Sequence, residues 1–94
     1  MRVVLRDSAL EDLDRINAWI SNDNPSAAAD MVSRIRDRIS FLEVDALAQM
    51  GRLGLVAGTR ELIEYPYIIV YRVDDHEREV VVLAILHGAQ SCSP

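Results

Sequence analysis

The spacing of the apolar residues changes halfway along the chain, and this change restricts the possible folds. In the first half, apolar residues recur every three or four positions, which is typical of amphipathic helices. The first stripe is Ala9, Leu13, Ile16 and Ile20, widened by Trp19, and the second is Ala28, Met31, Val32, Ile35, Ile39 and Leu42. After residue 58 the apolar residues form short runs rich in β-branched and aromatic side chains, which are typical of strands. The sequence therefore predicts two helices followed by a sheet.

Capping residues set the expected starts of the two helices. Ser8-Ala9-Leu10-Glu11 has the sequence of a capping box, in which the serine hydroxyl and the glutamate carboxylate each bind an unpaired backbone amide, so we expect the first helix to begin at Ser8. Asn24 is a suitable N-cap for the second helix, and Pro25 fits its first position because no hydrogen bond is needed from that amide. The short connection between the helices predicts a helical hairpin.

The remaining segments predict a small sheet. Residues 44–57 lose the helical spacing and contain glycines, so we expect the tail of the second helix and then a loop. The expected strands are Arg2–Arg6, Thr59–Glu64, Tyr67–Val73 and Glu79–His87. Val80–Leu86 is apolar throughout, so the last strand should be covered on both faces and lie inside the sheet. The order β-α-α-β-β-β predicts an α+β domain, with a helical hairpin packed on a mostly antiparallel sheet.

The size of the chain is that of one domain, so we expect residues 1–94 to form a single domain in which 88–94 are a flexible tail. We expect no membrane span, because the longest apolar run, Val80–Leu86, is too short. The N-terminus lacks the extended apolar segment of a secretory signal. The single cysteine, Cys92, cannot form an internal disulfide. We therefore expect a cytoplasmic protein.

The charge of the chain is negative. Fifteen acidic and ten basic residues give a formal net charge of −5, and every basic residue is an arginine. Such a chain lacks the overall attraction that drives general binding to nucleic acid, so we expect no such binding. A local arginine cluster can still hold a phosphate, because the planar guanidinium group suits paired hydrogen bonds to that group.

Five segments, in order along most of the chain, resemble motifs of the RelE/ParE toxin superfamily. They are Asn24-Pro25-Ser26-Ala27-Ala28, Gly51-Arg52-Leu53-Gly54, Gly58-Thr59-Arg60-Glu61-Leu62, Pro66–Val73 and Val82–Gly88. The expected order of helices and strands also matches the fold of that superfamily. The resemblance implies a toxin that arrests growth and is neutralised by a cognate antitoxin, which we expect to be a ribbon-helix-helix DNA-binding protein.

The resemblance implies one of two activities. RelE-like members cleave messenger RNA in the ribosome, using basic residues and a late tyrosine or histidine, whereas ParE-like members bind DNA gyrase and perform no chemistry. In a nuclease the catalytic set would be Arg60, Arg72 and His87, with arginine holding the scissile phosphate and histidine exchanging a proton. The residues after His87 include neither arginine nor tyrosine, and nothing supports Ser91 or Cys92 as a substitute.

Each of these three residues also has a structural interpretation. The arginines can form surface ion pairs, which is the commoner role of such residues, and the histidine can be a hydrogen-bonded residue at the end of a strand. The candidate acids are Glu61, Glu64 or another acid across the sheet for Arg60, and Asp74 and Asp75 for Arg72. The sequence leaves both interpretations open.

We favour the ParE-like activity, inhibition of DNA gyrase. The reasons are the net acidity, the absence of lysine, and the lack of tyrosine or arginine after His87. Arg52, Arg60, Arg72 and His87 are then candidate contacts with a target or partner. The alternatives are a RelE-like ribosome-dependent mRNA endonuclease and a non-toxic relic that only binds its antitoxin. No cofactor is expected, and no metal site, because Cys92 has no cluster of Cys and His residues around it.

Overall fold

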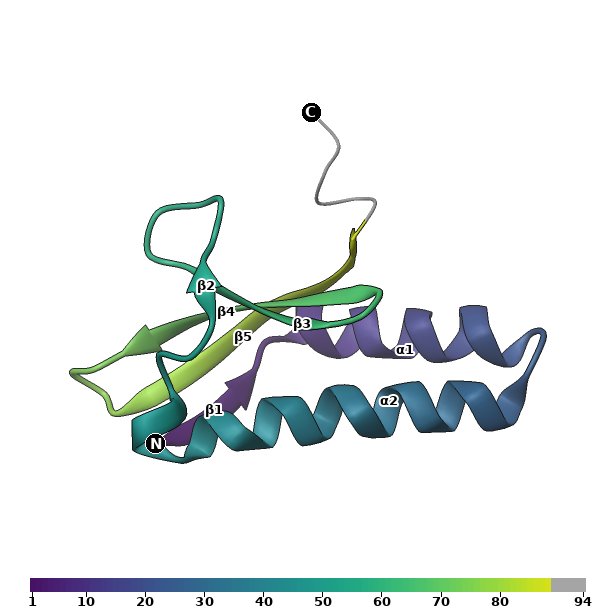
Figure 1. The fold of residues 1–94 in the computed structure, drawn as a ribbon, viewed down its shortest axis with the longest axis horizontal. Coiled ribbons are helices and arrows are strands. Elements are labelled where there is room, and N and C mark those ends of the chain that lie inside the picture. Colours follow the sequence, from purple (N-terminus) through teal and green to yellow (C-terminus); the bar gives the residue numbers. More distant parts are fainter. Residues whose placement is uncertain (89–94) are drawn as a thin grey trace.

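The structure, a computed structural model, describes residues 1–88, in which two helices cover one face of a five-stranded sheet (Figure 1). The elements are β1 (Arg2–Leu5), α1 (Asp7–Ser21), α2 (Pro25–Ser40), the short 3₁₀ helices η1 (Phe41–Glu43) and η2 (Asp45–Leu47), β2 (Arg52–Leu53), β3 (Arg60–Glu64), β4 (Tyr67–Asp74) and β5 (Glu79–His87). Residues 89–94 lie outside the described part, and with them Ser91, Cys92 and nearly all of the expected tail.

The strand order of the sheet is β1-β5-β4-β3-β2. β1 runs parallel to β5, and the other neighbouring pairs are antiparallel. The predictions of a mostly antiparallel sheet and of an interior position for β5 are therefore confirmed. The two-residue strand β2 was not predicted, because so short a strand leaves no apolar pattern; it exists through its pairing with β3.

The core lies between the helices and one face of the sheet. Both predicted apolar stripes contribute to it, and Ile35 of α2 is completely buried. The sheet contributes Leu62 of β3, Tyr67, Ile69 and Tyr71 of β4, and Val80, Val82 and Ile85 of β5. The predicted start of α2 is confirmed, since the Asn24 side chain accepts a hydrogen bond from the Ala27 amide at 3.0 Å and Pro25 is the first helical residue.

The capping box at Ser8 was a wrong prediction. α1 begins at Asp7, its N-cap is Arg6, and no side chain caps it. The Ser8 hydroxyl instead donates to the Leu83 carbonyl of β5 at 2.7 Å. Leu83 lies where the register of β4 and β5 shifts, between residues that pair with Val70 and Tyr71. The Ser8 hydroxyl is thus hydrogen-bonded to a backbone carbonyl distant in the sequence and does not cap the helix.

Two side chains of α1 close the edge of β5 beyond the end of β1. β1 pairs with β5 only at residues 79–82. Farther along β5, Ser8 binds the Leu83 carbonyl, and Asp12 Oδ2 accepts a hydrogen bond from the Ile85 amide at 2.9 Å. Ser8 and Asp12 are four residues apart and so lie on the same side of the helix. They bind backbone groups that a longer β1 would otherwise bind.

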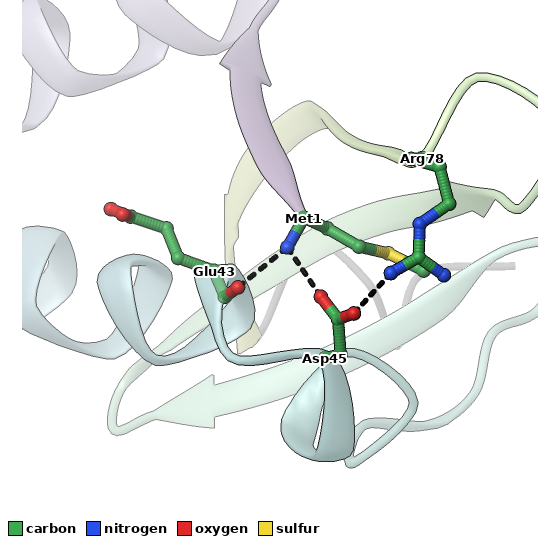
Figure 2. Close-up of polar contacts among 4 residues, drawn as sticks. All are labelled: Met1, Glu43, Asp45 and Arg78. Carbon is green, nitrogen blue, oxygen red and sulfur yellow. Dashed lines mark hydrogen bonds and ion pairs between the residues drawn. The ribbon is translucent and has the colours of Figure 1, made fainter.

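A cluster of charges holds the N-terminus against two other segments (Figure 2). The Met1 ammonium group donates to the Glu43 carbonyl at 2.7 Å and to Asp45 Oδ1 at 2.5 Å, while Arg78 pairs with Asp45 Oδ2. The hydrogen bond from the ammonium group is the main reason that the pKa of Asp45 lies below its ordinary value of 3.8. Arg78 lowers this pKa further, and desolvation opposes both effects.

Replacing Asp45 by asparagine is expected to lower the melting temperature at neutral pH and to have no effect in strong acid. Because the folded-state pKa of Asp45 is lowered, its carboxylate stabilises the fold above the ordinary pKa of 3.8. That contribution is lost as the pH falls through the folded-state pKa. Melting curves of wild type and Asp45→Asn between about pH 2 and about pH 7 measure the difference. Asp75→Asn, an exposed aspartate in the β4–β5 turn, is the control. A difference independent of pH would contradict the prediction.

Candidate functional site

Arg60, the first residue of β3, binds the backbone of the segment that precedes β2. Its Nη1 donates to the Gly51 carbonyl at 2.8 Å and to the Gln49 carbonyl at 3.2 Å. Of the two interpretations of Arg60, the ion pair with Glu61 or Glu64 is not found. Glu61 pairs with Arg52, and Glu64 with Arg38 of α2. The guanidinium group therefore already has a structural role.

Gly51 and Tyr71 form a close junction beside Arg60. The Gly51 amide donates to the Tyr71 hydroxyl at 2.9 Å, and both residues are buried. Burial raises the pKa of Tyr71 above 10.0, whereas the bond from Gly51 and the charge of Arg60 act to lower it. With its hydroxyl bound and its ring fully buried, Tyr71 is a packing residue and is not accessible to a nucleic-acid base.

Arg52 and Arg72 lie on the face of the sheet opposite the helices. Arg52 binds the carboxylate of Glu61 through Nε at 3.0 Å and through Nη2 at 2.9 Å. Glu61 is only 7% exposed, so the ion pair satisfies a nearly buried charge. Arg72 lies 4.0 Å from Asp74, one of the two acids that the sequence offered as its partner. Both arginines thus have acidic partners within the domain.

The structure does not bring Arg60, Arg72 and His87 together. Successive side chains in a strand point to opposite faces, and Tyr71 faces the helices, so Arg72 beside it faces away. Arg60 pairs with Tyr71 across the β3–β4 ladder and so lies on the helix side. His87 pairs with Tyr67, at the other end of β4. Tyr67 and Tyr71 are four positions apart along the strand, a distance of about 13 Å. One phosphate cannot contact all three side chains.

His87 instead lines a groove between α1 and the end of β5. The groove has a volume of about 600 Å³. Its lining residues are Asp12, Arg15, Ile16, Trp19, Tyr67, Ile85, Leu86 and His87. The rings of Tyr67 and His87 meet edge to face, with their centroids 5.5 Å apart and their planes at 87°. Burial raises the pKa of Tyr67. Apolar walls with a few polar groups are typical of a site that binds a ligand or a peptide segment.

Trp19 is the residue of this groove whose position the sequence predicted wrongly. Its spacing placed it in the apolar stripe of the first helix, but it is 78% exposed, whereas Ala9, Leu13 and Ile16 are buried. The stripe of α1 is therefore narrower than predicted, and the indole stands at the rim of the groove. A large aromatic residue at the edge of a helical stripe was the signal that could have indicated a binding surface.

Comparison with known proteins identifies the family. The chain matches the family model described as the ParE toxin of the type II toxin-antitoxin system, parDE, over residues 3–92. The chain belongs to the ParE toxin family. This ParE toxin is also 44% identical, over 87 residues, to the Sinorhizobium fredii protein named "Putative toxin Y4kP", and the alignment covers 87% of this chain and 82% of that protein.

Solved structures share the fold of this ParE toxin. A chain of the chromosomal ParDE TA system from P. aeruginosa superposes with a TM-score of 0.78 at 27% identity, covering 93% of this chain and 95% of that one. The RelBE2 complex of Mycobacterium tuberculosis gives a TM-score of 0.61 at 24% identity, with 92% and 95% covered, and shows the fold alone. The predicted α+β fold and the RelE/ParE resemblance are confirmed, and the chain is a ParE-like toxin of a type II toxin–antitoxin system.

Within residues 1–88 of this ParE toxin, no three His, Cys, Asp or Glu side chains gather in a group that could hold a metal ion. None of the helices in the same range has both the length and the apolar character needed to cross a bilayer.

Proposed function

We propose that this ParE toxin binds DNA gyrase and inhibits it, and that a cognate antitoxin neutralises it. The observation that carries the choice of activity is the separation of Arg60, Arg72 and His87 over two faces of the sheet and two ends of β4. RNA cleavage needs an acid, a base and a phosphate-binding group that converge on one phosphate. Inhibition by binding needs no such set, and membership of the ParE family supports it.

A supercoiling assay with purified gyrase tests the proposal. The added toxin is expected to reduce supercoiling, and the antitoxin to restore it. In bacteria that express the toxin alone, thymidine incorporation should fall before methionine incorporation. An earlier fall in methionine incorporation would identify the ribosome as the target and contradict the proposal. If neither falls, the chain is a non-toxic relic.

The double variant Arg72→Ala with His87→Gln is expected to arrest growth as strongly as wild type, because Arg72 pairs with Asp74 and His87 lines the groove beside α1, which we propose as the antitoxin contact. In a nuclease, loss of a general acid or base reduces the rate by roughly 10²–10⁴-fold, so the same variant would then be harmless. Colony counts after induction measure the effect, and a melting curve shows that the variant is folded. Arg60 is left unchanged because its hydrogen bonds to the Gln49 and Gly51 carbonyls make any loss of activity ambiguous.

The groove between α1 and β5 is the proposed contact for the antitoxin. A groove suits an extended or helical tail, because such a segment can insert its apolar side chains between the walls. Arg15 and Asp12 on its wall pair with each other at 3.0 Å, so they present little net charge to the partner. A toxin with net charge −5 does not attract an acidic tail as a whole, so burial of apolar surface should supply most of the affinity.

A further inference from the structure

The end of β2 and the loop that follows it, residues 53–58, present apolar side chains to solvent. Leu53, Leu55 and Val56 are 78%, 83% and 69% exposed. The chain has no charged residue between Arg52 and Arg60. In Figure 1 the loop projects from the sheet on the side away from α1 and α2. Single exposed apolar residues are common on protein surfaces, but an uncharged group of them on one projection is typical of an interaction site.

Hydrogen bonds within the loop fix its conformation. The Gly54 amide donates to the Thr59 carbonyl at 2.9 Å, and the amide and hydroxyl of Thr59 both donate to the Val56 carbonyl, at 3.1 and 2.6 Å. Gly58 has φ of +84°, a conformation that favours glycine. A Cβ on Gly54 would overlap Thr59 Oγ1, so only glycine fits there. The loop is therefore ordered before it binds, and binding loses little conformational entropy.

The two arginines that flank the loop are engaged by acceptors within the domain. Arg52 pairs with Glu61, and Arg60 binds the Gly51 and Gln49 carbonyls. A nucleic acid or an anionic membrane would be held mainly by cations directed at phosphate. The loop has none between its flanking arginines, and the chain carries a net charge of −5. The surface that covers the loop should therefore be apolar and belong to a protein.

We propose that this apolar loop, residues 53–58, inserts into an apolar pocket of the protein that the toxin inhibits. The inference rests on the proposed function, which names gyrase as that protein. We infer the partner of the loop and the partner of the groove from the shapes of these two surfaces. A projecting loop fits a pocket on a folded protein, whereas the concave groove beside α1 fits a tail, and we have assigned the groove to the antitoxin. The toxin thus contacts its target and its antitoxin through different surfaces.

The test compares the double variant Leu55→Ser with Val56→Ser against wild type in three assays. Inhibition of gyrase and growth arrest are expected to weaken by at least about tenfold, since truncating central apolar contacts of an interface commonly costs that much affinity. Antitoxin affinity and melting temperature should not change. The variant Leu55→Met with Val56→Ile keeps the loop apolar and should inhibit gyrase as strongly as wild type. Leu10→Gln, an exposed leucine of α1, should behave as wild type.

The outcomes separate the two proposals. If wild type inhibits gyrase and the serine variant inhibits it equally, the loop proposal is overturned and the gyrase proposal stands. If wild type arrests growth without inhibiting gyrase, the gyrase proposal fails. The loop proposal is then tested by growth arrest alone. Loss of growth arrest in the serine variant supports it, and retained growth arrest overturns it. If wild type does not arrest growth, both the gyrase proposal and the loop proposal are overturned.

Three further outcomes would assign the loop elsewhere and overturn its proposed role. The first is a serine variant that no longer binds the antitoxin. The second is wild-type binding to phosphatidylglycerol vesicles that the serine variant loses. The third is self-association of wild type, measured by light scattering, that the serine variant loses. A loop that docks into a second copy in this way would be an interface between toxin molecules.

Discussion

Replacing Gly51 by alanine is expected to destabilise the protein by about 3 kcal/mol or more. The added Cβ would lie 2.7 Å from the Tyr71 hydroxyl oxygen, 2.8 Å from the Glu61 carbonyl oxygen and 2.9 Å from Tyr71 Cε1. Neither neighbour can move easily, because Tyr71 is completely buried and the Glu61 backbone belongs to β3, which is paired with β2 on one side and β4 on the other. The displacement would also break the hydrogen bond from the Gly51 amide to Tyr71, leaving a buried amide unpaired.

Gly58→Ala is the matched control for Gly51→Ala. Gly58 has φ of +84°, but a Cβ there would have no atom within 4 Å. Its replacement by alanine should lower the free energy of unfolding by only about 1–2 kcal/mol, the strain of a residue with a side chain in the left-handed conformation. Urea denaturation of both variants gives the two free energies of unfolding. A cost for Gly51→Ala that does not exceed that for Gly58→Ala would mean that the junction with Tyr71 relaxes around the new methyl group.

The requirement for glycine at position 51 could not be predicted from the sequence. The motif Gly51-Arg52-Leu53-Gly54 resembles a superfamily loop, and the prediction that its glycines lie outside helices and strands is confirmed. What requires glycine is the Tyr71 side chain, which is 20 residues away along the chain. Local patterns report local conformation, whereas this close approach depends on how β4 packs against the segment that precedes β2. The Ser8 capping box failed for the same kind of reason, because Leu83 of β5 takes its hydroxyl.

The elements that bury one face were predictable because burial imposes a period on the sequence. The stripes of α1 and α2 and the apolar run of β5 follow directly from the core that they share. The candidate site was harder to predict. Alternation correctly placed Arg72 on the face of Ile68 and Val70, but the face of Arg60 required the register that pairs it with Tyr71. The sequence therefore offered the three residues of a nuclease, and only the register showed that they diverge.

Replacing Ile69 by alanine is expected to lower the free energy of unfolding by about 2–5 kcal/mol, which is the second large effect that we expect. Ile69 lies near the middle of β4 on the helix side of the sheet and is completely buried. The substitution removes apolar contacts and leaves a cavity that the packed helices cannot fill completely. Small domains are stable by roughly 5–15 kcal/mol in total, so the variant should be close to unfolding at growth temperature. Urea denaturation measures the change.

Ile63→Ala, the same change on the opposite face of the sheet, is the control for Ile69→Ala. Ile63 is 39% exposed in β3, so its truncation should cost less than about 1 kcal/mol. Its neighbour across the ladder, Ile68, is nonetheless only 5% exposed, although the two helices lie on the other face. Side chains of adjacent strands therefore shield one another there. If Ile63→Ala costs as much as Ile69→Ala, this face forms a second core that stabilises the sheet, and the expected contrast between the two faces is wrong.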